Sequence, residues 1–244
     1  MLGKVILVEG SDCSFKETNS IALYENLKNM GYDVRKYHFP NYESPSAALV
    51  KMYLSGALGD NASQINPYVA SQFYAVDRVA SYITEWKDFY LNGGIVVLDR
   101  YVESNAIHQG AKFTDIAEKN KFLNWVHNLE YNLNKLPKPD IVFFMDMPPI
   151  VAQAIMSKRG NKIDNGKLDI HEKDKNFMQE SYKNAKYVAN KFGWHTISCI
   201  QKGKVFLPDT NPLDIVKTKE TLAQEILQKA LEVVIGKKSD CVTL

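Results

Sequence analysis

Cysteine and arginine are both scarce in this chain of 244 residues. The three cysteines are few, odd in number and widely spaced, so they form neither a disulfide framework nor a zinc site. No apolar run approaches the roughly 18 residues of a membrane-spanning helix. The 30 basic residues against 28 acidic ones leave a net charge of +2, without the concentrated basic face that nucleic acid or an anionic membrane requires. We therefore expect a soluble, cytoplasmic protein that binds neither nucleic acid nor membrane.

The residues that are present predict one α/β domain spanning residues 1–244. A hydrophobic fraction of 45% is ample for a buried core. Continuous β-branched runs predict five buried strands, at Val5–Val8, Asp33–His38, Ile95–Leu98, Ile141–Met145 and His195–Ile200. Helical periodicity separates them, at Thr18–Met30, from Pro45, from Pro67 to about Tyr90, and at Asp115–Tyr131, Pro148–Lys158, His171–Phe192 and Leu213–Ile235. This alternation predicts a parallel sheet covered by helices on both faces.

Two polar stretches interrupt this pattern. Residues 157–170 contain glycine and few apolar residues, which is typical of a short lid. Residues 202–214 carry two prolines and predict an irregular excursion within a C-terminal extension, about residues 201–244. The five histidines have no metal-ligand spacing, so we expect structural or surface roles for them.

The first predicted strand leads through a short loop into a helix, which is the setting of a phosphate-binding loop. Backbone N–H groups and the helix N-terminus cradle a polyphosphate there, while a lysine neutralises its charge. The candidate residues for ATP are Gly10, Ser11, Asp12, Cys13, Ser14, Phe15, Lys16, Glu17 and Thr18.

This loop fits the pattern G-x-x-x-x-G-K-[ST] only in part. Gly10 and Lys16 have the expected spacing, but Phe15 replaces the second glycine and Glu17 replaces the hydroxyl residue. A glycine there commonly takes a positive φ that a bulky residue adopts only with strain. Thr18 offers a hydroxyl for Mg²⁺ one position late. An ordinary strand–turn–helix with a surface lysine remains the alternative.

The third predicted strand ends in Asp99-Arg100-Tyr101, at the edge where open α/β sheets place their ligands. A carboxylate there suits a magnesium shell, and an arginine suits a bidentate phosphate contact. A solvated salt bridge at a strand end is the alternative.

Several segments together resemble the thymidylate kinase family. Residues 99–110 (DRYVESNAIHQG) are similar to its D-R-Y-x-x-S-x-x-A-Y-Q-G segment, and residues 73–78 (FYAVDR) to its L-F-A-A-D-R segment. Residues 136–152 resemble its P-D-L…L-D-x-x-P-E-x-A segment, and residues 158–160 resemble the entry to its lid. The order and spacing agree over roughly residues 4–200.

The resemblance implies a three-layer P-loop kinase fold with a five-stranded parallel sheet and a short lid. It implies transfer of the γ-phosphoryl of ATP to thymidine monophosphate or a similar deoxynucleotide, with Mg²⁺, by a homodimer. The implied catalytic residues are Lys16, Asp99, Arg100 and Arg159, the last from the lid. The implied acceptor-binding residues are Asp12, Phe39, Tyr42, Tyr74, Arg78, Arg100, Ser104 and Gln109. Mg²⁺ is implied at Asp99, with Thr18 as a second ligand.

Two further departures from the family concern positive charge. Tyr42 stands where an arginine is expected to contact the acceptor phosphate, and Ile155 stands where many relatives carry an arginine. Together with Phe15 and Glu17, they leave two alternatives open. One is a nucleotide-binding or regulatory homologue with a disabled loop; the other is a related deoxynucleoside kinase.

Overall fold

The computed structural model describes residues 2–11, 13–61, 63–159, 170, 174–207 and 210–236. Its centre is one five-stranded sheet in the order β2-β3-β1-β4-β5, and every pairing is parallel. The strands are β1 Lys4–Gly10, β2 Val34–His38, β3 Ile95–Asp99, β4 Ile141–Asp146 and β5 His195–Ser198. Each of the five predicted strands is therefore present, and the predicted α/β class is confirmed.

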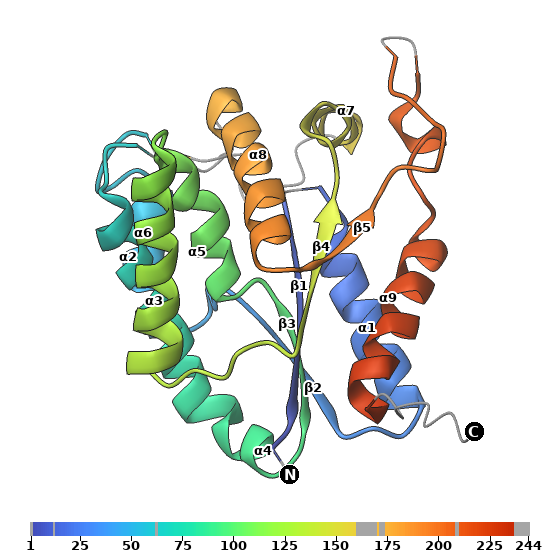
Figure 1. Cartoon of the computed structure of the whole chain (residues 1–244), viewed down its shortest axis with the longest axis horizontal. Helices are drawn as coiled ribbons and strands as arrows, with labels where there is room; N and C mark the ends of the chain where they lie inside the picture. The colour runs from blue at the N-terminus through green and yellow to red at the C-terminus, as the bar shows by residue number, and fades with distance from the viewer. Residues whose placement is uncertain are drawn as a thin grey trace, which may run out of the picture.

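Alternate residues of the central strands point to opposite faces of the sheet, and this divides the core in two. Ile6 and Val8 of β1 pack with α1 (Lys16–Asn29), α7 (Pro149–Arg159) and α9 (Lys219–Ile235). The register β1–β3 sets Ile95 and Val97 on the same face. Figure 1 shows α1 and α9 together on one side of the edge-on sheet.

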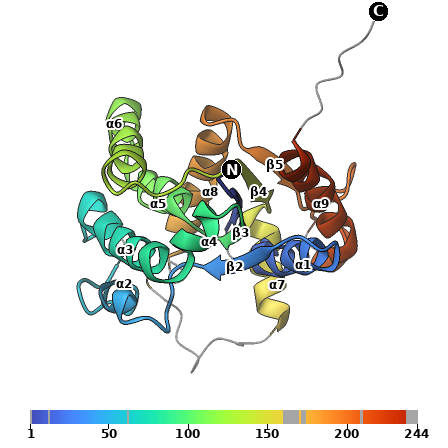
Figure 2. The same ribbon diagram turned by 90° about the horizontal axis from the view of Figure 1, so that it is seen from below.

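Val5 and Leu7 point to the opposite face and bury a second, more aromatic core. The helices over this face follow β2, β3 and β4 in the chain (Figure 1). They are α3 Pro67–Ser81, α5 Val102–His108, α6 Ile116–His127 and α8 Lys175–Lys191. Figure 2 shows α2 (Ala48–Leu54) on the outer side of α3, away from the sheet.

Shorter helical turns complete the described part of the chain. Two π-helical segments extend α3 and α6, at Tyr82–Trp86 and Asn128–Leu133, and α4 (Lys87–Leu91) follows the first of them. Three 3₁₀ turns lie at Pro45–Ala47, Gly110–Lys112 and Pro212–Asp214. Among the described residues, no helix is both long enough and apolar enough to cross a membrane.

Element boundaries account for most differences from the sequence-based prediction. The last helix begins at Lys219 rather than Leu213, because Thr218 caps it and Val216 pairs with Ile200 in an isolated bridge. Strand β5 ends at Ser198 rather than at the predicted Ile200, and Ile200 forms the isolated bridge instead. The predicted lid overlaps the end of α7 at residues 157–159, and its residues 160–169 lie outside the described part of the chain. Residues 171–173 of the helix predicted at His171–Phe192 lie outside it as well.

Parallel pairing brings the carboxyl ends of the strands to one edge of the sheet. β1 ends at Gly10, where the predicted phosphate loop begins, and β3 ends at Asp99. β2 ends at His38, in register with Asp99. The edge that the sequence marked for ligands is therefore the edge at which these three segments meet.

Candidate active site

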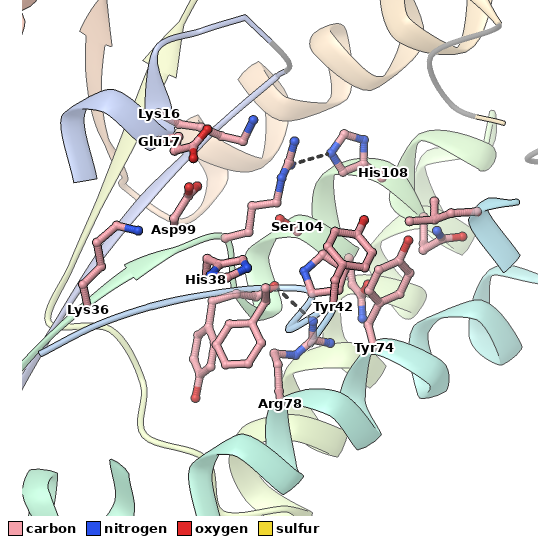
Figure 3. A pocket seen from close by; sticks show the side chains of 17 residues that line it. Lys16, Glu17, Lys36, His38, Tyr42, Tyr74, Arg78, Asp99, Ser104 and His108 are labelled. Carbon is pink, nitrogen blue, oxygen red and sulfur yellow. Dashed lines mark hydrogen bonds between the residues drawn. The ribbon is translucent and has the colours of Figure 1, made fainter. Parts of the chain in front are cut away.

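A cavity of about 360 Å³ opens at this edge of the sheet (Figure 3). Its walls come from the start of α1, the end of β2, α3, and the segment from β3 into α5. We call residues 10–18 the phosphate loop and residues 99–110 the acceptor segment. The cavity brings together most of the predicted side chains, which are Lys16, Glu17, Phe39, Tyr42, Tyr74, Arg78, Asp99, Arg100, Ser104 and Gln109.

The other predicted residues that the structure describes do not line this cavity. Gly10, Ser11, Cys13, Ser14, Phe15 and Thr18 form the loop behind it or the first turn of α1. Asp12 lies outside the described residues. Arg159 is the last residue of α7, and its side chain is likewise outside the description.

Phe15 takes the left-handed backbone conformation that was expected of a glycine, with φ 64° and ψ 17°. Such a conformation costs a non-glycine residue about 1–2 kcal/mol. The ring, however, is only 9% exposed and packs into the core on the α1 side of the sheet. Burial of a phenylalanine side chain contributes about 1.5–3 kcal/mol, which offsets the strain. The substitution thus keeps the shape of the loop and directs the ring away from the cavity.

Hydrogen bonds hold the rest of the loop. Ser14 N–H donates to the carbonyl of Ser11 at 3.3 Å, and the buried thiol of Cys199 donates to the carbonyl of Ser14 at 3.6 Å. At Gly10 the backbone passes so close that an added Cβ would lie 2.5 Å from Ser14 Oγ. Glycine is therefore required at this position for steric reasons.

Lys16 and Glu17 open helix α1 and both face the cavity (Figure 3). The N-terminus of this 14-residue helix carries partial positive charge, which favours an anion. Lys16 Nζ lies 3.5 Å from the carbonyl of Ser11, so the ammonium stays next to the loop. Glu17, and not Thr18, presents its side chain to the cavity from this turn.

Asp99 and Arg100 occupy the end of β3. Asp99 is only 7% exposed, and its buried Oδ1 accepts no hydrogen bond from the described residues. Arg100 has φ 64°, which turns the chain sharply after the strand. Its Nη1 lies 3.2 Å from Nε2 of His108 on α5. Since a guanidinium only donates, this contact makes Nε2 the acceptor and puts the imidazole proton on Nδ1.

Aromatic side chains form the side of the cavity opposite the phosphate loop. Tyr74 comes from α3 and Tyr42 from the segment after β2, and Figure 3 shows both rings on the same side. Tyr42 is 41% exposed, whereas Phe39 is buried. A flat aromatic wall of this kind suits stacking on a planar base.

Arg78 reaches the cavity from below and is almost fully buried. It forms an ion pair with Glu130 from the π-helical segment after α6, and its Nη1 donates to the carbonyl of Tyr101 at 3.2 Å. Burial opposes the charge of the guanidinium, but Glu130 and its hydrogen bonds outweigh this and raise the pKa of Arg78. The side chain is therefore held rigidly in its charged form.

The acceptor segment supplies polar groups to the same wall. Ser104 Oγ donates to Glu9 at 2.7 Å, and Gln109 Nε2 lies 3.4 Å from the hydroxyl of Tyr53. The buried Oε1 of Gln109 has no hydrogen-bond donor among the described residues. It is available as an acceptor for a ligand. The sequence did not predict that residues 102–108 form a helix, although this helix positions Ser104.

Sequence reasoning also missed cavity residues. Lys36 and His38 line it from the end of β2, and Asn105 and His108 line it from α5. Two of these are histidines for which structural or surface roles were expected. Alternation along a strand that ends at the ligand edge was the available signal for Lys36 and His38. Glu9 is buried beneath the cavity, and nothing in the sequence marked it.

Comparison with known proteins supports the family resemblance. The family model described as thymidylate kinase matches residues 8–202. A thymidylate kinase of Plasmodium falciparum (isolate 3D7) is 29% identical over 82% of this chain and 84% of its own length. That of an Exiguobacterium species is 30% identical over 71% of this chain and 78% of its own length. The thymidylate kinase of Mycobacterium tuberculosis is 29% identical over 72% of this chain and 81% of its own length.

Proposed function

Because this chain belongs to the thymidylate kinase family, we propose that it transfers the γ-phosphoryl group of ATP to thymidine monophosphate. A phosphate oxygen of the acceptor attacks the γ-phosphorus, the bond to the ADP oxygen breaks, and the products are ADP and the nucleoside diphosphate. The observation that carries this proposal is the convergence of Lys16, Arg100 and an aromatic wall on one cavity. Such a reaction asks the protein mainly to position two anions and neutralise developing charge.

The phosphate loop and the start of α1 would hold the donor. Backbone N–H groups and Lys16 suit the β- and γ-phosphates. Asp12 is proposed near the acceptor sugar and Arg159 over the donor, both from the family resemblance. The left-handed conformation of Phe15 supports an active loop over an inactive homologue, since the backbone keeps the shape that a glycine would give.

The acceptor phosphate would bind at Arg100. Tyr42 stands where the family has an arginine, but Lys36 and His38 bring other basic side chains to the same cavity. We propose that these two compensate in part for the missing arginine. The base would stack on Tyr74, with Arg78, Ser104 and Gln109 at its edge.

Magnesium fits the residues present at the strand end. The buried Asp99 Oδ1 has no hydrogen-bond partner among the described residues, and Mg²⁺ prefers one or two carboxylates together with substrate phosphates and water. A bound Mg²⁺ would neutralise phosphate charge during the transfer. We propose Asp99 for this role; Glu17 faces the same space, whereas Thr18 does not line the cavity.

A homodimer is proposed as well. Helix α3 and its π-helical extension expose Val69, Val76 and Ile83 at intervals of seven residues. Their exposed fractions are 43%, 54% and 60%. An apolar stripe at this spacing suits a second helix. Analytical ultracentrifugation should find a dimer, and Val76→Glu should convert it to a monomer.

A coupled assay that follows ADP tests the proposed activity. With ATP, Mg²⁺ and thymidine monophosphate, the purified protein should release ADP in proportion to diphosphate formed. Thymidine in place of its monophosphate should give no turnover. Turnover with thymidine alone would favour a deoxynucleoside kinase, and failure to turn over while binding both nucleotides would favour the inactive homologue.

A further inference from the structure

Glu9 is a fully buried carboxylate directly beneath the active-site cavity, and the proposed reaction gives it no role. It is the penultimate residue of β1, one position before the phosphate loop. A carboxylate in such a place costs free energy unless donors satisfy it. The groups around it show how this is done.

Three donors from three segments reach the carboxylate. Oε1 accepts from the backbone N–H of Tyr101 at 3.0 Å and from Ser104 Oγ at 2.7 Å. Oε2 accepts from the backbone N–H of Gly10 at 3.3 Å. Tyr101 and Ser104 are 92 and 95 residues away in the sequence. One side chain therefore joins the phosphate loop, the turn after β3 and helix α5.

The charges around Glu9 fit this arrangement. Burial raises the pKa of Glu9, while Arg100 and the hydrogen bonds from Ser104 and Tyr101 oppose that rise. Asp99 adds a small repulsion. All three described hydrogen bonds are donated to Glu9, and each of them favours the ionised acceptor over the protonated acid.

The bond from Ser104 has a consequence for ligand recognition. A serine hydroxyl has one hydrogen and two lone pairs. Because that hydrogen is committed to Glu9, Ser104 can present only lone pairs to the cavity that it lines. It thereby becomes an acceptor for an N–H or O–H group of the bound nucleotide.

We propose that Glu9 is a positioning residue, which fixes Ser104 as a hydrogen-bond acceptor and holds the Arg100–Tyr101 turn against the start of the phosphate loop. This inference rests on the proposed function for its substrate. We expect Glu9 to affect mainly the binding of the acceptor nucleotide. Two of its three hydrogen bonds, including the shortest, come from the acceptor segment.

The decisive variant is Glu9→Gln, compared with Glu180→Gln, which changes an exposed glutamate of α8 in the same way. The amide keeps the size of the side chain, but its NH₂ group faces either Gly10 N–H or the two donors at Oε1, and its neutral oxygen accepts more weakly than a carboxylate from Tyr101 and Ser104. We expect the KM for thymidine monophosphate to rise on the order of tenfold, and the KM for ATP to change less than threefold. The Glu180 variant should match the unmodified protein. Equal changes in both KM values, or none, would overturn the proposal.

A double-mutant cycle with Ser104→Ala separates positioning from general destabilisation. If Glu9 acts through the Ser104 hydroxyl, the two effects on acceptor KM should be clearly less than additive. Fully additive effects would contradict the proposal. Circular dichroism will reveal whether Glu9→Gln folds. If it does not, Ser104→Ala alone must still raise the KM for thymidine monophosphate severalfold. An unchanged KM in that variant would contradict the proposal.

Calorimetry with thymidine monophosphate alone distinguishes this inference from the proposed activity. If the unmodified protein binds the nucleotide but does not phosphorylate it, the proposed function fails. The Glu9 proposal then still predicts weaker binding in Glu9→Gln, by the same order of tenfold. Unchanged binding in that variant would reject it whatever the activity.

Discussion

The phosphate loop and the acceptor segment meet at the same edge of the sheet, but different parts of their chemistry match the family. In the loop, Phe15 and Glu17 replace expected residues, yet the backbone at Phe15 keeps the left-handed form that a glycine would adopt. In the acceptor segment Ser104 donates to the buried Glu9, and the carbonyl of Tyr101 accepts from Arg78, which is paired with the buried Glu130. The loop preserves a conformation, while the segment preserves the side chains at six of the eight positions that the family motif specifies, with Ile107 and His108 as the exceptions.

This difference follows from how each region would contact a phosphate in the proposed reaction. A loop that binds through backbone N–H groups tolerates changed side chains as long as φ and ψ hold. A guanidinium that binds through a fixed fork tolerates almost no change. The comparison therefore predicts larger functional effects in the acceptor segment and larger effects on packing in the loop.

The largest expected effect comes from Arg100→Ala. Removing the guanidinium should weaken binding of thymidine monophosphate by at least about a hundredfold, since a charged bidentate contact is lost. ATP affinity should stay within about threefold. Calorimetry with each nucleotide measures both values. Arg35→Ala, whose side chain lies over the Phe89 ring away from the cavity, serves as the control. Equal acceptor affinity would show that the phosphate binds elsewhere.

Phe15→Gly should cost stability rather than activity. Losing the buried ring removes about 3–5 kcal/mol, and relief of the left-handed strain returns about 1 kcal/mol. We expect a net loss of about 2–4 kcal/mol in urea unfolding, with kcat within about threefold. Cys13→Gly relieves another positive φ, of 56°, without removing a large ring, and should change stability by less than about 1 kcal/mol. A tenfold gain in kcat for Phe15→Gly would mean that Phe15 impairs the loop.

Glu103→Gln should reveal a pH dependence that belongs to the acceptor segment. Burial raises the pKa of Glu103 to about 7, against the stabilising hydrogen bond from Tyr131. The folded protein thus holds this proton up to about pH 7, while the unfolded chain releases it near 4.5. Its contribution to stability is full below pH 4.5 and is lost as pH rises through 7.

Glutamine stays neutral at every pH. The free energy of unfolding of the variant, relative to that of the unmodified protein, should therefore increase from pH 5 to pH 8. We expect a gain on the order of 1–3 kcal/mol, measured by urea unfolding at both pH values. Glu118→Gln, on the exposed first turn of α6, should show no such trend. A constant difference across this range would contradict the shifted pKa.

The smallest expected effect is in the basic residues at the end of β2. Replacing both Lys36 and His38 by alanine should raise the KM for thymidine monophosphate about two- to tenfold, because partly solvated basic side chains contribute modestly. The shift should shrink in high salt. Lys51→Ala, an exposed lysine of α2, is the matched control. An unchanged KM would exclude compensation for the arginine missing at Tyr42.

Periodicity and end signals predicted most of the fold. Strands such as Ile95–Asp99 are continuous apolar runs, and their alternation with helices leaves few possible topologies. The helix at residues 102–108 escaped prediction, because its buried residues include Glu103 and Asn105 and it shows no ordinary apolar stripe. Tertiary packing on α6 and α8 decides its form.

The site was predictable where its residues are close together in the sequence. The acceptor segment shows its chemistry in twelve consecutive residues, and the cavity joins it with the loop as expected. Glu9 could not be found in this way, since it acts through contacts with Tyr101 and Ser104, which lie 92 and 95 residues away in the sequence. Burial and partners are properties of the fold and leave no local pattern.

The sequence by itself determined the sheet and the phosphate loop. It also has only four arginines, and three of them fall on positions that the family resemblance assigns to nucleotide contacts. Only the tertiary structure decided how those charges are held. Arg78 is fixed by Glu130 and Arg100 lies against His108, while Glu9 spans more than ninety residues to reach Ser104. Local sequence sets dihedral preferences and apolar period, but hydrogen bonds between distant segments exist only once the chain has packed.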